Sequence, residues 1–167
     1  MRLAISAFAG LTILLLFFCY KGLFVNQHIL ASNFIEQPLP NIHGQDLEDK
    51  DISLNAIEGP YLLNVFASWC SACRYEHGFW LDHAHDIRII GLAYKNSKPK
   101  LKNWLKLYGN PYKTVLLDIT GKQSMQIGVY GTPETFVIGR DGKIKYRHVG
   151  VMSDYVWRNK ILPLYRS

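Results

Sequence analysis

Three short apolar runs, separated by helix-like segments, constrain the fold of this chain more than any other feature. The runs are residues 61–67, 87–94 and 113–119, and the segments between them are residues 71–83 and about 98–108. A short apolar run without alternation is typical of a strand buried on both faces. Strands joined through helices pair in parallel, so the sequence predicts a parallel sheet with helices packed against it.

The last third of the chain adds two strands in a different arrangement. A short helix is expected at residues 122–127, and residues 134–138 read as a fourth strand. The turn at residues 140–143 leads into residues 144–149, which predicts an antiparallel hairpin, and residues 154–165 read as a closing helix. We therefore expect an α/β fold of order β-α-β-α-β-β-α, with a central mixed sheet flanked by helices on both faces.

An uncharged segment precedes this domain. Residues 3–20 carry no charge over 18 positions, and as a helix they span about 27 Å, which nearly matches the hydrocarbon core of a bilayer. A cleavable signal peptide usually has a shorter apolar region that ends in small residues, whereas this one ends in the bulky residues 17–20. The sequence favours an uncleaved transmembrane anchor, with cleavage near Ala31 as the alternative.

The expected organisation is a membrane anchor at residues 1–25, a linker at residues 26–37 and a folded domain at residues 38–167. A short N-terminal tail before a single anchor usually stays in the cytoplasm, so the domain would lie outside it, where disulfides persist. The net charge of +6 comes largely from lysines. It indicates a solvated face, or else attraction to anionic lipid or an acidic partner, while nucleic acid is not expected for an exported domain.

Two cysteines, Cys70 and Cys73, lie between the first apolar run and the helix that follows it. Covalent haem attachment requires CxxCH, and Arg74 follows the pair, which excludes that use. Structural zinc usually takes four ligands, and the nearby histidines, His77 and His83 among them, match no familiar zinc spacing. The sequence therefore favours thiol-disulfide exchange over metal binding.

Thiol-disulfide exchange requires an ionised sulfur that a partner can reach. Cys70 would lie just before the helix, where unpaired N–H groups favour a thiolate, so we expect it to be the exposed nucleophile. Cys73, inside the first turn and more buried, would be the resolving thiol that attacks a mixed disulfide. Trp69 would shield the sulfur and offer a flat apolar surface to a bound peptide, or would simply pack in the core.

A second notable loop, Tyr130 to Pro133, precedes the fourth strand. A proline directly before a strand is a candidate for a cis peptide bond, although trans is the default, because cis accounts for about 5–6% of X–Pro bonds in folded proteins. NVFASWCSAC and GTPETFVI together resemble the thioredoxin superfamily. The fuller segments WCSACRYEH and GVYGTPETFVIGRDGKI are similar to its membrane-tethered CcmG/DsbE branch, and the likeness extends from about Leu39 to the C-terminus.

The resemblance implies a thioredoxin-like fold with a cis bond between Thr132 and Pro133 beside the cysteines. The backbone before the proline would pair with an extended substrate segment, so that Thr132 contributes through its main chain. The substrate-binding residues that it implies are Trp69, Tyr130, Thr132 and Pro133.

The resemblance also implies a function. The protein would act as a reductant that keeps the haem-binding cysteines of apocytochrome c, or a thiol partner joined to them, free of disulfides during cytochrome c maturation. Its only redox group would be the disulfide between Cys70 and Cys73, with no metal and no other cofactor. A membrane electron donor of the DsbD/CcdA type would recharge it. It would be a single-pass protein of the bacterial inner membrane with its C-terminal domain in the periplasm.

Asn64 lies six residues before Cys70, where ordinary thioredoxins carry a buried aspartate that manages the proton of the second cysteine. Asparagine cannot take a proton, so another base is needed. Glu76, on the same helical face as Cys73, and Glu134, just after the proline, match acidic positions of the CcmG branch. We expect both to face the cysteines and to tune Cys73 or transfer its proton.

Two alternatives stay open. Within the same chemistry, the chain would be a broader thiol-disulfide protein of the TlpA type. In another class, it would be a metal-binding or chaperone module that uses Cys70, Cys73 and His77. His77 lies one turn from Cys73, and we expect its side chain to be exposed to solvent.

Overall fold

The structure, a computed structural model, describes residues 2–23 and 34–167. The chain divides into two compact units, Met1–Ala31 and Ser32–Ser167. In the first unit the described residues form helix α1, Arg2–Leu23. Across both described ranges, no helix combines the length and the apolar character needed to cross a membrane.

Most of the predicted linker, residues 26–37, lies outside the described residues. Its last four residues fold with the second unit. The Glu36 N–H donates to the carbonyl of Ile144 at 2.8 Å, and the side chains of Phe34 and Ile35 pack on the core. The folded domain therefore includes these four residues.

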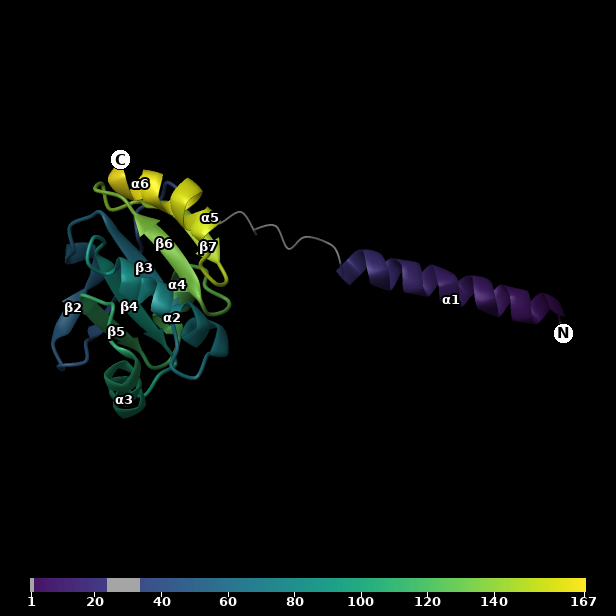
Figure 1. The fold of residues 1–167 in the computed structure, drawn as a ribbon, viewed down its shortest axis with the longest axis horizontal. Helices are drawn as coiled ribbons and strands as arrows, with labels where there is room; N and C mark the ends of the chain where they lie inside the picture. Colours follow the sequence, from purple (N-terminus) through teal and green to yellow (C-terminus); the bar gives the residue numbers. More distant parts are fainter. Residues whose placement is uncertain (1, 24–33) are drawn as a thin grey trace. The chain divides into compact units, whose positions relative to one another are not determined.

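The second unit contains a five-stranded mixed sheet (Figure 1). The strands lie in the order β5-β4-β3-β6-β7. Strands β3, β4 and β5 pair in parallel, and β6 and β7 are antiparallel to their neighbours, which confirms the predicted mixed sheet. The bounds are β3 Tyr61–Phe66, β4 Ile89–Tyr94, β5 Thr114–Asp118, β6 Glu134–Ile138 and β7 Ile144–Val149.

The helices of this unit follow the predicted segments closely. They are α2 Ser71–His83, α3 Lys98–Tyr108 with Pro99 in its first turn, and the short α4 Lys122–Gln126. The closing segment, predicted as one helix, is α5 Asp154–Val156, a π-helical turn at Trp157–Ile161 and α6 Leu162–Arg166. Pro163 lies in the first turn of α6, where its missing N–H removes an intrahelical donor next to the π-helical turn.

A two-stranded hairpin before the main sheet was not predicted from the sequence. It consists of β1 His43–Gln45 and β2 Asp51–Ser53, followed by a 3-10 turn at Leu54–Ala56. Strands of three residues are too short to show a period of two, so the sequence gives little signal for them.

The two faces of the main sheet are covered by different parts of the chain. Successive strand residues point to opposite faces, and the first face buries Leu62 and Phe66 under α2, α3 and the C-terminal helical segment. Consecutive right-handed crossovers in one direction along the sheet place α2 and α3 on the same side. The second face buries Leu63 and Val65 under residues 39–57 and the turn that ends α4. The long helices therefore pack on the first face, while the second face is covered by residues 39–57, which include the 3-10 turn, and by the segment that ends α4.

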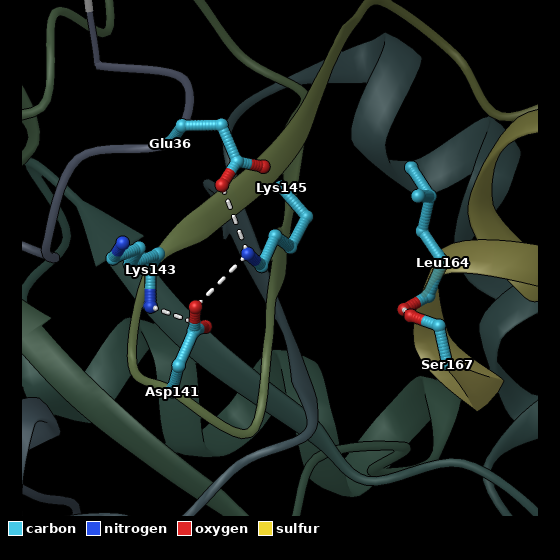
Figure 2. A network of polar contacts seen from close by, with 6 residues as sticks. All are labelled: Glu36, Asp141, Lys143, Lys145, Leu164 and Ser167. Carbon is cyan, nitrogen blue, oxygen red and sulfur yellow. Dashed lines mark hydrogen bonds and ion pairs between the residues drawn. The ribbon is translucent and has the colours of Figure 1, made fainter.

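A small polar network fixes the β6–β7 hairpin at the surface (Figure 2). The ammonium of Lys145 lies 2.9 Å from Asp141 Oδ2 in the turn and 3.0 Å from Glu36 Oε2 in the preceding segment. The Lys143 N–H donates to Asp141 Oδ1 at 3.2 Å. The carboxylates are largely exposed, so we expect each pair to add little stability.

Candidate active site

The two cysteines of the CxxC motif lie where strand β3 passes into helix α2. Cys70 is the N-cap residue of α2, with extended backbone angles, and the Cys73 N–H donates to the Cys70 sulfur at 3.2 Å. A cysteine at this position therefore receives one of the N–H groups that the first helical turn leaves unpaired. This confirms that the motif lies at the carboxyl end of a central strand, where open α/β sheets place their chemistry.

The Cys70 sulfur is less exposed than the sequence predicts. Cys70 as a residue is only 9% exposed, because the loop before β6 covers it: the Cys70 thiol lies 3.4 Å from the carbonyl oxygen of Thr132. Cys73 is more deeply buried, as predicted, with 2% exposed. Burial, together with hydrogen bonding to the Cys70 sulfur, raises the pKa of the Cys73 thiol far above its ordinary range. Cys73 therefore needs a base before it can act as a nucleophile.

The loop before β6 lies against the cysteines, as the resemblance implies. The peptide bond between Thr132 and Pro133 is cis, and the Pro133 carbonyl accepts from the Gly150 N–H at 2.9 Å. Tyr130 is 62% exposed and Trp69 is 61% exposed. The two implied substrate-binding aromatics are thus available at the surface.

Trp69 is held in place through its polar edge. Its indole Nε1 donates to the carbonyl oxygen of Lys95 at 3.2 Å, and its ring lies 6.3 Å from the ring of Tyr94. The loop that follows β4 therefore orients Trp69. Because Trp69 is mostly exposed, it does not pack in the core and its ring is available at the surface.

Glu76 is buried rather than exposed. Residues Cys73, Glu76, His77 and Trp80 have the spacing of one helical face and are all buried. Two side chains donate to Glu76 Oε1, the Trp80 indole at 2.9 Å and the Asn64 amide at 3.2 Å, and the Met152 N–H donates to Oε2 at 2.9 Å. Burial outweighs these donors and raises the pKa of Glu76. A carboxyl group that binds a proton more readily than usual is thus held one turn from Cys73.

Asn64 connects Glu76 to two further side chains that the sequence analysis did not identify. The Asn64 amide nitrogen donates to Thr135 Oγ1 at 3.1 Å, and the Tyr112 hydroxyl donates to Asn64 Oδ1 at 2.9 Å. Asn64 and Thr135 are direct cross-strand partners of β3 and β6. The position of Tyr112 after the turn-forming Asn-Pro pair gave no sign of this contact, because Tyr112 is 48 residues from Asn64 in the chain.

Glu134 is also buried, but its partners differ from those expected. Its cross-strand partner is Val65 and its neighbour on the same face is Phe136, both in the core of the second face. Asn64 lies on the first face with α2. Glu134 therefore projects from the opposite face of the sheet to Asn64, not toward the α2 side where Cys73 lies.

The carboxylate of Glu134 is occupied by the loop and by a buried arginine. Oε1 accepts from the Tyr130 N–H at 3.2 Å and the Gly131 N–H at 3.4 Å, and Oε2 accepts from Arg147 at 2.7 Å. The Arg147 guanidinium also lies 5.2 Å from the centre of the exposed Tyr130 ring. Arg147 was not singled out from the sequence, although a buried arginine in a strand requires an acidic partner.

The expectation that His77 is exposed is wrong. The residue is 4% exposed and its ring packs edge-on against Trp104, with centroids 4.3 Å apart, because it lies on the buried face of α2. Nε2 pairs with the Gly109 carbonyl at 3.0 Å, and burial lowers the pKa of His77. In the described ranges no cluster of histidine, cysteine and acidic residues is suited to hold a metal ion, so the geometry offers no support for the metal-binding module.

This geometry suits two sequential sulfur displacements. The Cys70 sulfur sits at a helix start, a second thiol lies one turn further, and a buried acid with a raised pKa follows on the same face. The backbone of the loop before β6 borders the first sulfur through the Thr132 carbonyl, and the same loop carries the exposed Tyr130.

Comparison with known proteins agrees with this chemistry. The Redoxin family model matches residues 35–160. The chain is 42% identical over 144 residues to the thiol:disulfide interchange protein DsbE of Yersinia pestis, covering 83% of this chain and 77% of that protein. It is 40% identical over 143 residues to DsbE of Escherichia coli K12, with the same coverage.

A solved structure supports the fold. The thio-disulfide isomerase from Thermus thermophilus matches with a TM-score of 0.65 at 21% identity, over 78% of this chain and 96% of that chain. At this identity the match shows the fold alone. It confirms a thioredoxin-like α/β fold with a mixed central sheet.

Proposed function

The chain belongs to the Redoxin family and, within it, to the DsbE thiol:disulfide interchange proteins. From this membership we propose that it is a membrane-anchored periplasmic reductant of cytochrome c maturation. Its membership makes it a thiol-disulfide oxidoreductase. The observation that carries the proposal is the position of the Cys70 sulfur, within hydrogen-bonding distance of both the Cys73 N–H and the Thr132 carbonyl.

In the first step the Cys70 thiolate attacks one sulfur of a substrate disulfide. A bond forms between Cys70 and that sulfur, and the other substrate sulfur leaves as a thiolate that takes up a proton. The Cys73 N–H supports the anionic sulfur before the attack. The product is a mixed disulfide between Cys70 and the substrate.

In the second step Cys73 loses its proton and attacks Cys70. The Cys70–Cys73 disulfide forms, the bond to the substrate breaks, and the second substrate sulfur leaves as a thiolate. The substrate has gained two electrons and the protein has lost two. Glu76 is the proposed acceptor of the Cys73 proton, because its carboxyl group has a raised pKa and lies one turn along α2.

The proposed substrate-binding residues lie directly before Cys70 in the chain and in the loop whose Thr132 carbonyl contacts its sulfur. Trp69 and Tyr130 offer exposed rings to an extended substrate segment, and Thr132 and Pro133 offer the backbone of the loop. Glu134 acts on this site through the loop, since its carboxylate accepts from two loop N–H groups. This assigns Glu134 to tuning the site rather than to proton transfer.

The direction of the reaction and its setting are supported by the motifs and by the relatives named DsbE. A reductant in an oxidising compartment must be recharged from the membrane, and a DsbD/CcdA-type protein is the proposed donor. Confinement beside that donor raises the effective concentration of the two partners. The proposed anchor is the uncharged stretch of residues 3–20, and the support for it is its sequence alone.

Trapping the mixed disulfide tests the proposed substrate. In the variant Cys73→Ala the second step cannot occur, so Cys70 should accumulate in cells as an adduct with a CxxCH-containing protein. The double variant lacking both cysteines is the control and should form none. Adducts with many unrelated proteins and none with a CxxCH protein would instead favour the broader TlpA-type function.

The anchor is tested on the full chain. After alkaline carbonate washing, the intact protein should remain with the membrane fraction, whereas a variant without residues 2–25 should be released. Release of the intact protein would reject anchoring and leave the exchange chemistry untouched.

A further inference from the structure

The ring of Tyr112 is fixed in the core beside the candidate active site. It stacks on Phe66 with centroids 4.4 Å apart and is 6% exposed. Gly91 of β4 makes room for it, because a Cβ there would lie 3.1 Å from Tyr112 Cγ and 2.8 Å from the Phe66 ring. The ring therefore has little freedom, and its hydroxyl has a fixed position.

That hydroxyl determines the orientation of the Asn64 amide. Tyr112 donates to Asn64 Oδ1 at 2.9 Å, while Asn64 Nδ2 donates to Glu76 Oε1 and Thr135 Oγ1. An amide has one accepting and one donating end. A donor on Oδ1 therefore keeps the donating end toward the carboxylate of Glu76.

We propose that Tyr112 is a positioning residue for the second sulfur displacement, in which its hydroxyl locks the Asn64 amide so that Glu76 is held to receive the proton of Cys73. The inference rests on the proposed function and deepens it. Tyr112 acts through Asn64 and Glu76 and touches neither the substrate nor the reacting sulfurs. The position of Asn64, where ordinary thioredoxins carry aspartate, thus has a defined use as a link between a phenol and a carboxyl group.

The charges around Tyr112 agree with this role. Burial, and then the negative charges of Glu76 and Cys73, raise the pKa of Tyr112, so its hydroxyl remains a donor throughout the working pH range. His77 of α2 is a further titratable group near it, with its ring centroid 6.4 Å from that of Tyr112. The strand residues of this network, Asn64 of β3 and Thr135 of β6, have uncharged side chains.

The experiment isolates the second displacement. The mixed disulfide between Cys70 and glutathione is prepared on the full-length protein, and the release of glutathione by Cys73 is followed from mildly acidic to alkaline pH. In Tyr112→Phe the ring packing stays and one hydroxyl is lost. We expect a roughly tenfold slower release near neutral pH and a shifted pH midpoint, in keeping with one buried hydrogen bond.

A matched control is available on the same strand as Asn64. Tyr61 is 1% exposed and its hydroxyl donates to the Leu54 carbonyl at 3.1 Å, on the opposite face of the sheet. Tyr61→Phe should lower stability by a similar amount and leave the pH midpoint in place. An equal shift in Tyr61→Phe, or no shift in Tyr112→Phe, would overturn the inference.

A second variant covers the case in which Tyr112→Phe folds poorly. Asn64→Leu removes the link itself, so it should shift the midpoint in the same direction, and adding Tyr112→Phe should change nothing further. An unshifted Asn64→Leu variant overturns the inference. Failure of the CxxCH adduct to form, with normal glutathione release, would count against the cytochrome c role alone.

Discussion

Arg147 and Glu134 form a buried ion pair between the two antiparallel strands of the sheet. The guanidinium Nε and Nη2 each lie 2.7 Å from Glu134 Oε2, and the side chains are 7% and 0% exposed. The other carboxylate oxygen accepts from the backbone of the loop that contacts Cys70. The Arg147–Glu134 ion pair, on the face of the sheet opposite to α2, therefore supports the loop before β6, whose Thr132 carbonyl contacts the Cys70 sulfur.

Replacing Arg147 should be costly. Arg147→Met leaves the Glu134 carboxylate buried without its cation, and breaking such a pair typically costs about 3–5 kcal/mol. Lys145→Met, two residues away in the same strand, removes a surface network (Figure 2) and should cost much less, because water and salt screen exposed charges. Denaturant unfolding of the two variants measures the difference, and equal losses would show that the buried pair does not stabilise the strand.

Glu134→Gln separates support of the loop from proton transfer. The amide cannot accept from both Arg147 and the loop N–H groups as the carboxylate does, so the loop should loosen. We expect KM for a disulfide peptide to rise by about three- to tenfold, which corresponds to a loss of about 1 kcal/mol of binding free energy. The pH dependence of glutathione release should keep its midpoint. A moved midpoint would return Glu134 to a role in proton transfer.

Glu76 should make stability depend on pH. Its pKa is raised in the folded protein, so the unfolded chain releases this proton first as pH rises above the ordinary value of 4.5. Stability from this group is complete below that value and is lost as pH rises through the folded pKa. Glu76→Gln carries no such proton. The difference in unfolding free energy between the wild type and the variant should therefore fall with increasing pH, and a constant difference would contradict the burial effect.

His77 should act in the opposite direction. Burial lowers its pKa, so the unfolded chain binds a proton first as pH falls below the ordinary value of 6.5. The wild type should lose stability below that pH relative to His77→Leu. His85→Leu, at an exposed position of the following turn, is the matched control for replacing a histidine by leucine. Parallel unfolding curves for wild type and His77→Leu at all pH values would contradict the prediction.

Local features of the site were predictable from the sequence. The bounds of α2 and the N-cap position of Cys70 follow from an apolar run, a CxxC pair and a helical pattern within about twenty residues of one another. The cis bond before β6 agreed with the family motif. The small β1–β2 hairpin was missed, because each strand is only three residues long.

The surroundings of the acidic residues were not predictable in this way. Glu76 and Glu134 were expected to act together because Glu76 shares a helical face with Cys73, Glu134 follows Pro133, and both match acidic positions of the CcmG branch. The alternation of β6 sends Glu134 to the face away from α2, and a shift of one residue in register would have reversed this. His77 was expected at the surface, since α3 and its Trp104 lie more than twenty residues further along the chain.

The sequence by itself determined the order of the main-sheet strands and of the helices between them, the family and the position of the two sulfurs at the start of a helix, because these depend on neighbours along the chain. Only the tertiary structure decided which charged and polar groups surround them. Tyr112 reaches Asn64 across 48 residues, and the Met152 N–H reaches Glu76 across 76. Such contacts form when sheet register and helix packing bring distant segments together, and a linear pattern does not record them.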